Sequence, residues 1–174
     1  SLVVRNGTAL VGTELEAVPL GQLRLAGDQV AEIAPAGSAD GSNGSAQAEL
    51  DLRGGFVLPA LVDAHVHLSL SGRGDPFGGW NGGPGDRMAC AMLSGLRCLA
   101  AGIGAVRDLG CPDHTVIEYG RMVESGTAVG PRVRAAGRAL TPPEGHIARY
   151  SRVASGADGL REAADEQLEG GARV

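Results

Sequence analysis

Beyond its first third, the chain alternates apolar segments with amphipathic ones, and this alternation restricts the fold more than any other feature. Residues 56–67 (FVLPALVDAHVH) are apolar on both faces, and residues 86–102 (DRMACAMLSGLRCLAAG) place apolar side chains at helical spacing. Residues 103–110 and 113–126 repeat this pair of patterns. Strands that alternate with helices in this way predict an α/β fold with right-handed βαβ units and a parallel sheet.

The pattern continues, with a third strand expected at 131–137, a third helix at 156–171 and the start of a fourth strand at 172–174. An open doubly wound sheet and a TIM (β/α)8 barrel both fit. The segment after the first strand has no GxGxxG turn opening into a helix and no Walker lysine, which favours the barrel. Because a closed barrel takes about 250 residues, residues 56–174 would form only its first part, about three and a half βα units.

Residues 1–55 have the pattern of short strands joined by turns. An Asn6-Gly7 turn and a Gly27-Asp28 turn separate alternating apolar segments. A stretch rich in Gly and Ser at 36–47 is typical of an exposed loop. We therefore expect a small β domain over residues 1–55, followed by the barrel portion over residues 56–174.

Composition narrows the classes of function. The net charge is −5 and the arginines do not cluster into a basic stripe, which argues against nucleic-acid binding. No apolar run approaches the roughly 18 residues of a membrane-spanning helix, and the first residues lack the features of a signal peptide, so we expect no membrane association and a cytoplasmic location. Three cysteines without metal-site spacing indicate reduced, buried thiols.

Two of the four histidines, His65 and His67, stand two residues apart at the end of the first predicted barrel strand. Side chains two apart on a strand share a face, with Cα atoms roughly 6.5 to 7 Å apart, so one metal ion could bind both imidazoles. Asp63 has the same parity and could orient an imidazole or pair with an arginine. The carboxyl ends of barrel strands are where active sites of this architecture lie.

The segment LDLRGGFVLPALVDAHVHL (50–68) resembles the first barrel strand of the metal-dependent amidohydrolase superfamily. GIGAVRDLG, GPRVRAAGRALTPPEGH and GADGLREAADEQLEGGARV are similar to the strands and helices that follow in its imidazolonepropionase-like and Xaa-Pro dipeptidase (prolidase)-like branch. The resemblance implies a small β-sandwich built from both ends of a longer chain and a TIM barrel with one or two divalent metal ions, zinc being the expected ion. It assigns His65 and His67 as metal ligands.

Two features depart from the family pattern. Ala60 replaces the glycine that usually follows the proline, a change of little cost unless φ is positive there. All 15 basic residues are arginines, so the metal-bridging carbamylated lysine of the family is absent, as are its later histidine ligands. The proton-shuttling aspartate is expected beyond Val174, so we assign no catalytic residue within this sequence.

Other residues are weaker candidates. His146 follows the third strand, where a Gly-His in similar enzymes contacts substrate, although a loop histidine is more often a surface residue. Arg107 could form a buried ion pair with Asp63. His114 is expected to face solvent, and Trp80 could line a substrate pocket or cap the core.

The resemblance implies hydrolysis of an amide or peptide-like C–N bond by a metal-activated water, with a dipeptide or N-acyl amino acid as substrate. The C-terminal half of the barrel would then be a partner of this chain and could be a second polypeptide. A homo-oligomer is also compatible with this interpretation. Three alternatives stay open: a cyclic amidohydrolase or deaminase acting on a heterocycle, a catalytically silent binding or assembly subunit, and an unrelated α/β fold in which the histidine pair is a coincidence.

Overall fold

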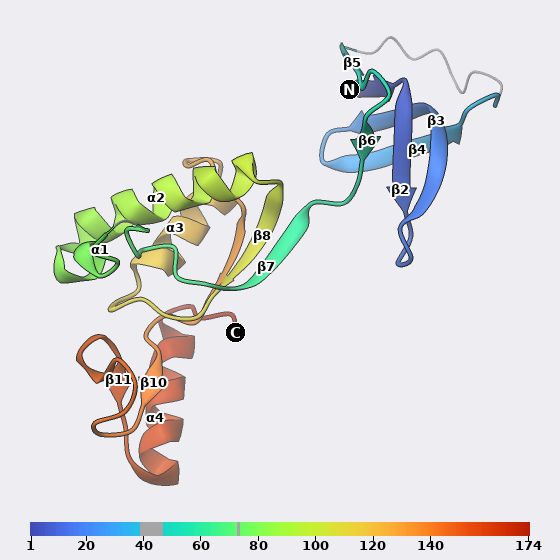
Figure 1. The fold of residues 1–174 in the computed structure, drawn as a ribbon. Coiled ribbons are helices and arrows are strands. Elements are labelled where there is room, and N and C mark those ends of the chain that lie inside the picture. The colour runs from blue at the N-terminus through green and yellow to red at the C-terminus, as the bar shows by residue number, and fades with distance from the viewer. Residues whose placement is uncertain (39–46, 73) are drawn as a thin grey trace. The chain divides into compact units, whose positions relative to one another are not determined.

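A computed structural model describes residues 1–38, 47–72 and 74–174 of the protein (Figure 1). The chain divides into two compact units, Ser1–Pro59 and Ala60–Val174. Most of the loop predicted at 36–47 lies outside the described residues. Among the described segments, no helix has the length and apolar character that crossing a membrane requires.

The first unit is a β-sheet with a small apolar core. Its strands run in the order β5-β1-β3-β2-β6, and β4 pairs with β3. The core is formed by Val4, Ala9, Leu20 and Leu23. The described part of this unit holds one sheet, so the second sheet of a sandwich stays a prediction. The strand bounds are β1 Leu2–Arg5, β2 Gly7–Val11, β3 Glu16–Ala26, β4 Gln29–Pro35, β5 Ala48–Asp51 and β6 Phe56–Val57.

One of the two predicted turns is confirmed and the other is wrong. Ala26 pairs with Gln29 across the antiparallel β3 and β4, with Gly27 at φ 61°, so Gly27-Asp28 is a two-residue hairpin turn. The chain does not reverse its direction at Asn6-Gly7, because β1 and β2 both pair antiparallel with β3 and therefore run the same way. Asn6, at φ 57°, instead bends the chain between two strands that run in the same direction.

The apolar run 56–67, predicted as one strand, is divided at its proline. Phe56–Val57 pairs with β2 in the first unit, whereas β7 (Leu61–Val66) belongs to the second unit. Proline has no N–H to donate to a ladder, so a continuous strand through Pro59 is disfavoured.

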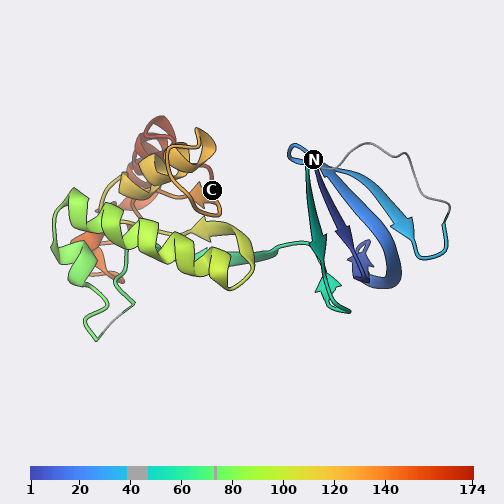
Figure 2. The same cartoon turned by 90° about the horizontal axis from the view of Figure 1, so that it is seen from above.

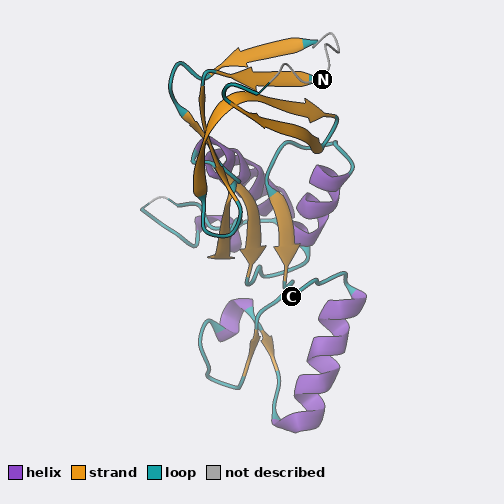
Figure 3. Cartoon of the chain, turned by 90° about the vertical axis from the view of Figure 1, so that its right-hand side faces the viewer, coloured by secondary structure: helices purple, strands orange, loops and turns teal. Residues whose placement is uncertain are grey.

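The second unit begins with a three-stranded parallel sheet, and these strands run side by side in the same direction (Figure 3). Their order, β7-β8-β9, is the order of the strands in the chain. The predicted parallel arrangement is therefore confirmed for these strands. Helices α2, α3 and α4 begin and end within two residues of the predicted 86–102, 113–126 and 156–171. The bounds are β7 Leu61–Val66, α1 Gly78–Asn81, α2 Pro84–Ala100, β8 Ile103–Asp108, α3 Thr115–Glu124, β9 Arg132–Ala135, β10 Leu140–Thr141, η1 Ala148–Tyr150, β11 Arg152–Val153 and α4 Gly156–Glu169.

Helices α2 and α3 pack against this parallel sheet (Figures 1 and 2). Val106 of β8 and its pairing partner Val133 of β9 lie in the core with Ala91 of α2 and Val116 of α3. Their neighbours Arg107 and Arg134 are exposed. Alternate residues of β8 and β9 therefore define a helix-covered face and an opposite, open face.

The last elements follow β9. β10 and β11 form a two-stranded parallel sheet, and α4 packs by β10. The predicted fourth strand at 172–174 is not assigned as a strand, although the N–H of Arg173 donates to the carbonyl oxygen of Ala135 at the end of β9.

Candidate metal centre

His65 and His67 lie together at the carboxyl end of β7. Their ring centroids are 5.6 Å apart with the planes at 71°. Val66, between them, packs against the helix-covered core. Since successive side chains on a strand point to opposite faces, the two imidazoles extend from the open face of the sheet.

Asp63 does not share this face, contrary to the prediction from parity. It pairs with Val106, a core residue, and its charge contributes to the raised pKa of the Cys98 thiol in α2, after the larger effect of burial. The register shifts between Asp63 and Val66, so both face the helices although they are three residues apart. The Asp63 carboxylate does contact the backbone of the histidine segment, because its Oδ1 accepts a hydrogen bond from the N–H of His65.

The ring of His67 is held by the backbone after β8. Its Nδ1 lies 3.0 Å from the carbonyl oxygen of Gly110. A carbonyl can only accept a hydrogen bond, so this contact requires the proton on Nδ1, and in the neutral ring Nε2 then keeps its lone pair. Gly110 has φ 153°, and a Cβ there would lie 3.1 Å from the Cβ of Ala139. The glycine thus allows the close backbone turn that presents this carbonyl.

Asp108 of β8 pairs with Val66, the residue between the two histidines, and is fully buried. Its Oδ2 accepts from the N–H of Leu68 at 2.7 Å, and its Oδ1 accepts from the N–H of Gly110 at 3.1 Å. Burial raises the pKa of Asp108 to about 6, while the two amides and the nearby His67 oppose the rise.

An aromatic cluster borders His67. The ring of Trp80 meets His67 edge to face, at 5.6 Å between centroids and 85°. Trp80 also contacts Phe77 and Tyr150, and these two stack with centroids 5.4 Å apart. The Tyr150 hydroxyl donates to Oδ1 of Asn81 at 2.6 Å, so the segment after β10 is fastened to the segment after β7.

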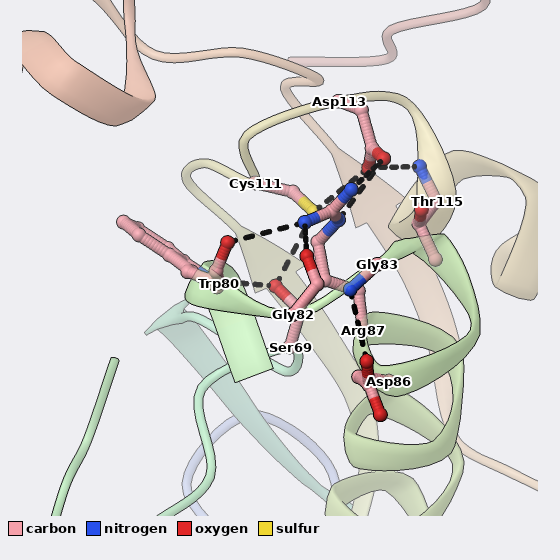
Figure 4. A network of polar contacts seen from close by, with 9 residues as sticks. All are labelled: Ser69, Trp80, Gly82, Gly83, Asp86, Arg87, Cys111, Asp113 and Thr115. Carbon is pink, nitrogen blue, oxygen red and sulfur yellow. Dashed lines mark hydrogen bonds and ion pairs between the residues drawn. The ribbon is translucent and has the colours of Figure 1, made fainter. Parts of the chain in front are cut away.

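A network of polar contacts holds Trp80 in place (Figure 4). Its indole Nε1 donates to Ser69 Oγ at 2.8 Å, and that hydroxyl donates to the Cys111 thiol at 3.3 Å. Arg87 of α2 donates to the carbonyl oxygens of Trp80 and Gly82 at 3.1 and 2.7 Å. Trp80 therefore both caps the core and borders His67, whereas the sequence left these two roles as alternatives.

The same network reaches Asp113 at the start of α3. Arg87 forms a 2.9 Å ion pair with Asp113, whose Oδ1 accepts from the N–H of Thr115 at 2.9 Å. Burial alone would raise the pKa of Asp113, but hydrogen bonds from Thr115, Cys111 and Arg87 leave it lowered. Burial raises the pKa of Cys111 to about 11, so this thiol is not a nucleophile at neutral pH.

Among the described side chains, no hydrogen bond or ring contact joins Arg107, His146 or His114 to the histidine pair. Arg107 is exposed and donates to the carbonyl oxygen of Ala64 at 2.8 Å, so the expected buried ion pair with Asp63 is not formed among the described side chains. His146 is exposed in the segment between β10 and η1. His114 was expected to face solvent, but it is half-buried and its Nε2 lies 3.1 Å from Oε1 of Gln167.

Two adjacent imidazoles fit part of a zinc site, which takes nitrogen ligands at about 2.0 to 2.1 Å. Within residues 1–38, 47–72 and 74–174, no group of three or more His, Cys, Asp or Glu side chains could hold a metal ion. The described residues therefore provide two candidate ligands and lack the remainder of a metal centre.

Comparison with known proteins finds partial sequence similarity to two curated enzymes. No family model matches the sequence. An allantoinase from Rubrobacter xylanophilus is 34% identical over 109 residues, which are 58% of this chain and 17% of the relative. An adenine deaminase from a Chelativorans species is 33% identical over 70 residues, 40% of this chain and 11% of the relative.

Solved structures match over nearly the whole chain. A prolidase crystallised with N-methylphosphonate-L-proline has a TM-score of 0.80 at 24% identity and covers 98% of this chain, which spans 44% of that protein. A Xaa-Pro dipeptidase with bound methionine has a TM-score of 0.75 at 20% identity, over 98% of this chain and 45% of that protein. The chain thus has the fold of part of these proteins and spans less than half of their length.

Proposed function

We propose that the chain is the N-terminal portion of a hydrolase acting on a C–N bond and contributes half of its metal site, because its fold is similar to part of a prolidase and of an amidohydrolase, and part of its sequence is similar to an allantoinase. His65 and His67 would bind the divalent ion, zinc in the simplest case. The observation that carries the proposal is the imidazole pair at the carboxyl end of a parallel strand, with His67 Nδ1 held by Gly110 and Nε2 available.

In this proposal residues 1–55 belong to a β-sandwich domain and residues 56–174 to a (β/α)8 barrel, although the boundary between the two compact units falls after Pro59. The remaining ligands and the proton-shuttling aspartate would come from the C-terminal half of the barrel, on this chain's continuation or on a second polypeptide. A divalent ion supplies Lewis-acid activation of water and of the scissile carbonyl. The residues present here would hold His67 in one tautomer and border it with the Trp80 ring.

For the substrate we propose a dipeptide or N-acyl amino acid, which the prolidase and Xaa-Pro dipeptidase likenesses favour. His146 would contact it. Its exposed segment is fastened beside the His67 end of β7, since Tyr150 bonds Asn81 and stacks on Phe77. The second candidate is a cyclic amide or a heterocycle, and the matches to an allantoinase and an adenine deaminase favour it.

The two candidates separate in one assay. The native protein, with any further chain that copurifies, is tested on Xaa-Pro dipeptides, allantoin and adenine before and after chelation. We expect dipeptide hydrolysis that is lost on chelation, is restored by zinc and is abolished in His65→Ala/His67→Ala. His114→Gln is the matched control, because His114 bonds Gln167 away from the pair, and it should keep its activity.

Turnover of allantoin or adenine without turnover of dipeptides would contradict the dipeptide or N-acyl amino acid proposal and support a cyclic amide or heterocycle as substrate. Activity that survives both chelation and the double substitution would remove the metal-hydrolase proposal. A complete lack of hydrolysis in a metal-loaded protein would favour a binding or assembly subunit.

A further inference from the structure

Asp108 is a buried carboxylate with an unusual set of partners. It is fully shielded from solvent, and both of its oxygens accept hydrogen bonds from backbone amides and not from basic side chains. A buried carboxylate is costly unless its hydrogen bonds are satisfied, so the protein keeps this charge only where the two amides are held in place.

Both amides belong to residues that adjoin His67, one in the sequence and one through a hydrogen bond. Leu68 follows His67 directly, so the 2.7 Å bond to Oδ2 fixes the backbone just beyond the imidazole. Gly110, which binds Oδ1 at 3.1 Å, is the residue whose carbonyl oxygen receives the His67 Nδ1–H. A further backbone bond, from the N–H of Leu109 to the carbonyl of Val66, closes the same junction between β7 and β8.

We propose that Asp108 is a positioning residue that sets the tautomer and direction of the His67 ring through these two amides. Without it, the two bonds that hold the Gly110 backbone and the backbone after His67 to one carboxylate are gone, the Leu109–Val66 bond remains at this junction, and the Nδ1–H bond is lost or shared with water. The tautomer claim stands on contacts in this chain alone. Its consequence for metal binding rests on the proposed function.

Asp108→Asn is the sharpest variant. The amide has the same shape, but its NH2 group must face one of two backbone N–H donors, so one of the two hydrogen bonds is replaced by a repulsive contact. Gln167→Met is the matched control. Gln167 is also buried, and its Oε1 also accepts from a backbone amide, that of Arg138 at 2.8 Å, but it contacts His114 instead of His67.

The first measurement uses the native protein freed of metal and labelled with 15N-histidine, with the His67 signals identified by their loss in His67→Gln. We expect His67 in the wild type to carry its proton on Nδ1, in Asp108→Asn to become a mixture of tautomers, and in Gln167→Met to remain as in the wild type. A wild-type His67 protonated on Nε2 overturns the inference without any variant. So does an Asp108→Asn protein whose His67 signals are unchanged.

The second measurement is zinc affinity by competition with a chelator. Loss of a residue that orients a metal ligand typically weakens binding by about 10- to 100-fold, and we expect this for Asp108→Asn but not for Gln167→Met. Equal zinc affinities in Asp108→Asn and the wild type overturn the link to metal binding. The two proposals fail in different measurements. Zinc retention in His65→Ala/His67→Ala would show that the proposed function is wrong, whereas the His67 tautomer is measured without metal and tests this inference alone.

Discussion

Cys111 shows how burial changes a single group. It is 2% exposed, and its pKa is about 11 against 9.0 for an ordinary thiol. The folded state therefore keeps the proton between pH 9 and 11 while the unfolded chain loses it, so stability should fall as pH rises through this window, by up to about 1.4 kcal/mol per pH unit. The chain has no lysine to titrate in the same range.

Urea unfolding at a series of pH values from 8 to about 11 measures this slope, with Cys111→Ala as the comparison. The variant should lose part of the decline that the wild type shows. Identical slopes in the two proteins would mean that the Cys111 thiol is not protected in the folded state.

At the residue scale, sequence parity predicted part of the site. It placed His65 and His67 together, and their rings are 5.6 Å apart. It failed for Asp63, because side-chain alternation holds only along an unbroken ladder and the register shifts between Asp63 and Val66. No sequence signal marks that shift. The role of Asp108 was also missed, although a carboxylate at the end of a predicted buried strand is a signal that could have found it.

At the element scale, the contact between α2 and α3 depends on a glycine. A Cβ at Gly95 would collide with the phenol of Tyr119, a fully buried residue whose hydroxyl donates to the carbonyl of Val129. Gly95→Ala should therefore destabilise the protein by about 1 to 3 kcal/mol, although alanine is the better helix former. Gly85→Ala in the same helix meets no neighbouring atom and should stabilise by about 0.4 to 1 kcal/mol.

Thermal unfolding of the two alanine variants tests this contact. Equal melting temperatures for Gly95→Ala and Gly85→Ala would show that α2 and α3 do not approach as closely as the structure has them.

Arg87 of α2 joins three parts of the chain, since it binds the carbonyl of Trp80 in α1, the carbonyl of Gly82 just after α1, and Asp113 just before α3. Its side chain is 11% exposed, and Arg87→Ala should cost about 1.5 to 3 kcal/mol because it leaves carbonyls and a carboxylate unpaired. Arg161→Ala removes an ion pair between exposed side chains and should change little. The fluorescence of Trp80, the single tryptophan, reports both transitions. Equal losses in the two variants would contradict the role given to Arg87.

Element boundaries follow from the same local chemistry. Amphipathic spacing located α2, α3 and α4 to within two residues. The division of residues 56–67 into β6 and β7 was missed, because the prediction gave the apolar run more weight than the proline within it. The Asn6 bend was mistaken for a hairpin turn. The strands on either side of it, β1 and β2, pair with β3 and not with each other, and no local sequence pattern reveals this pairing.

At the scale of the whole molecule, the chain leaves large apolar side chains in contact with solvent. Val62 is 70% exposed and Phe56 is 63% exposed, and Leu61, beside Val62 in β7, is 53% exposed. Exposed strands with apolar side chains invite association, so the 174-residue chain expressed alone should self-associate with rising concentration. Size exclusion with light scattering measures this, and a monodisperse monomer would contradict it and favour a complete small subunit.

The histidine pair provides the most direct test of the account. Metal content is measured by mass spectrometry in the native protein, with any copurifying chain, and in His65→Ala/His67→Ala, with His114→Gln as control. The account predicts bound zinc in the wild type and the control, and its loss from the double variant. A double variant that retains all of its zinc would contradict the assignment of His65 and His67 as metal ligands.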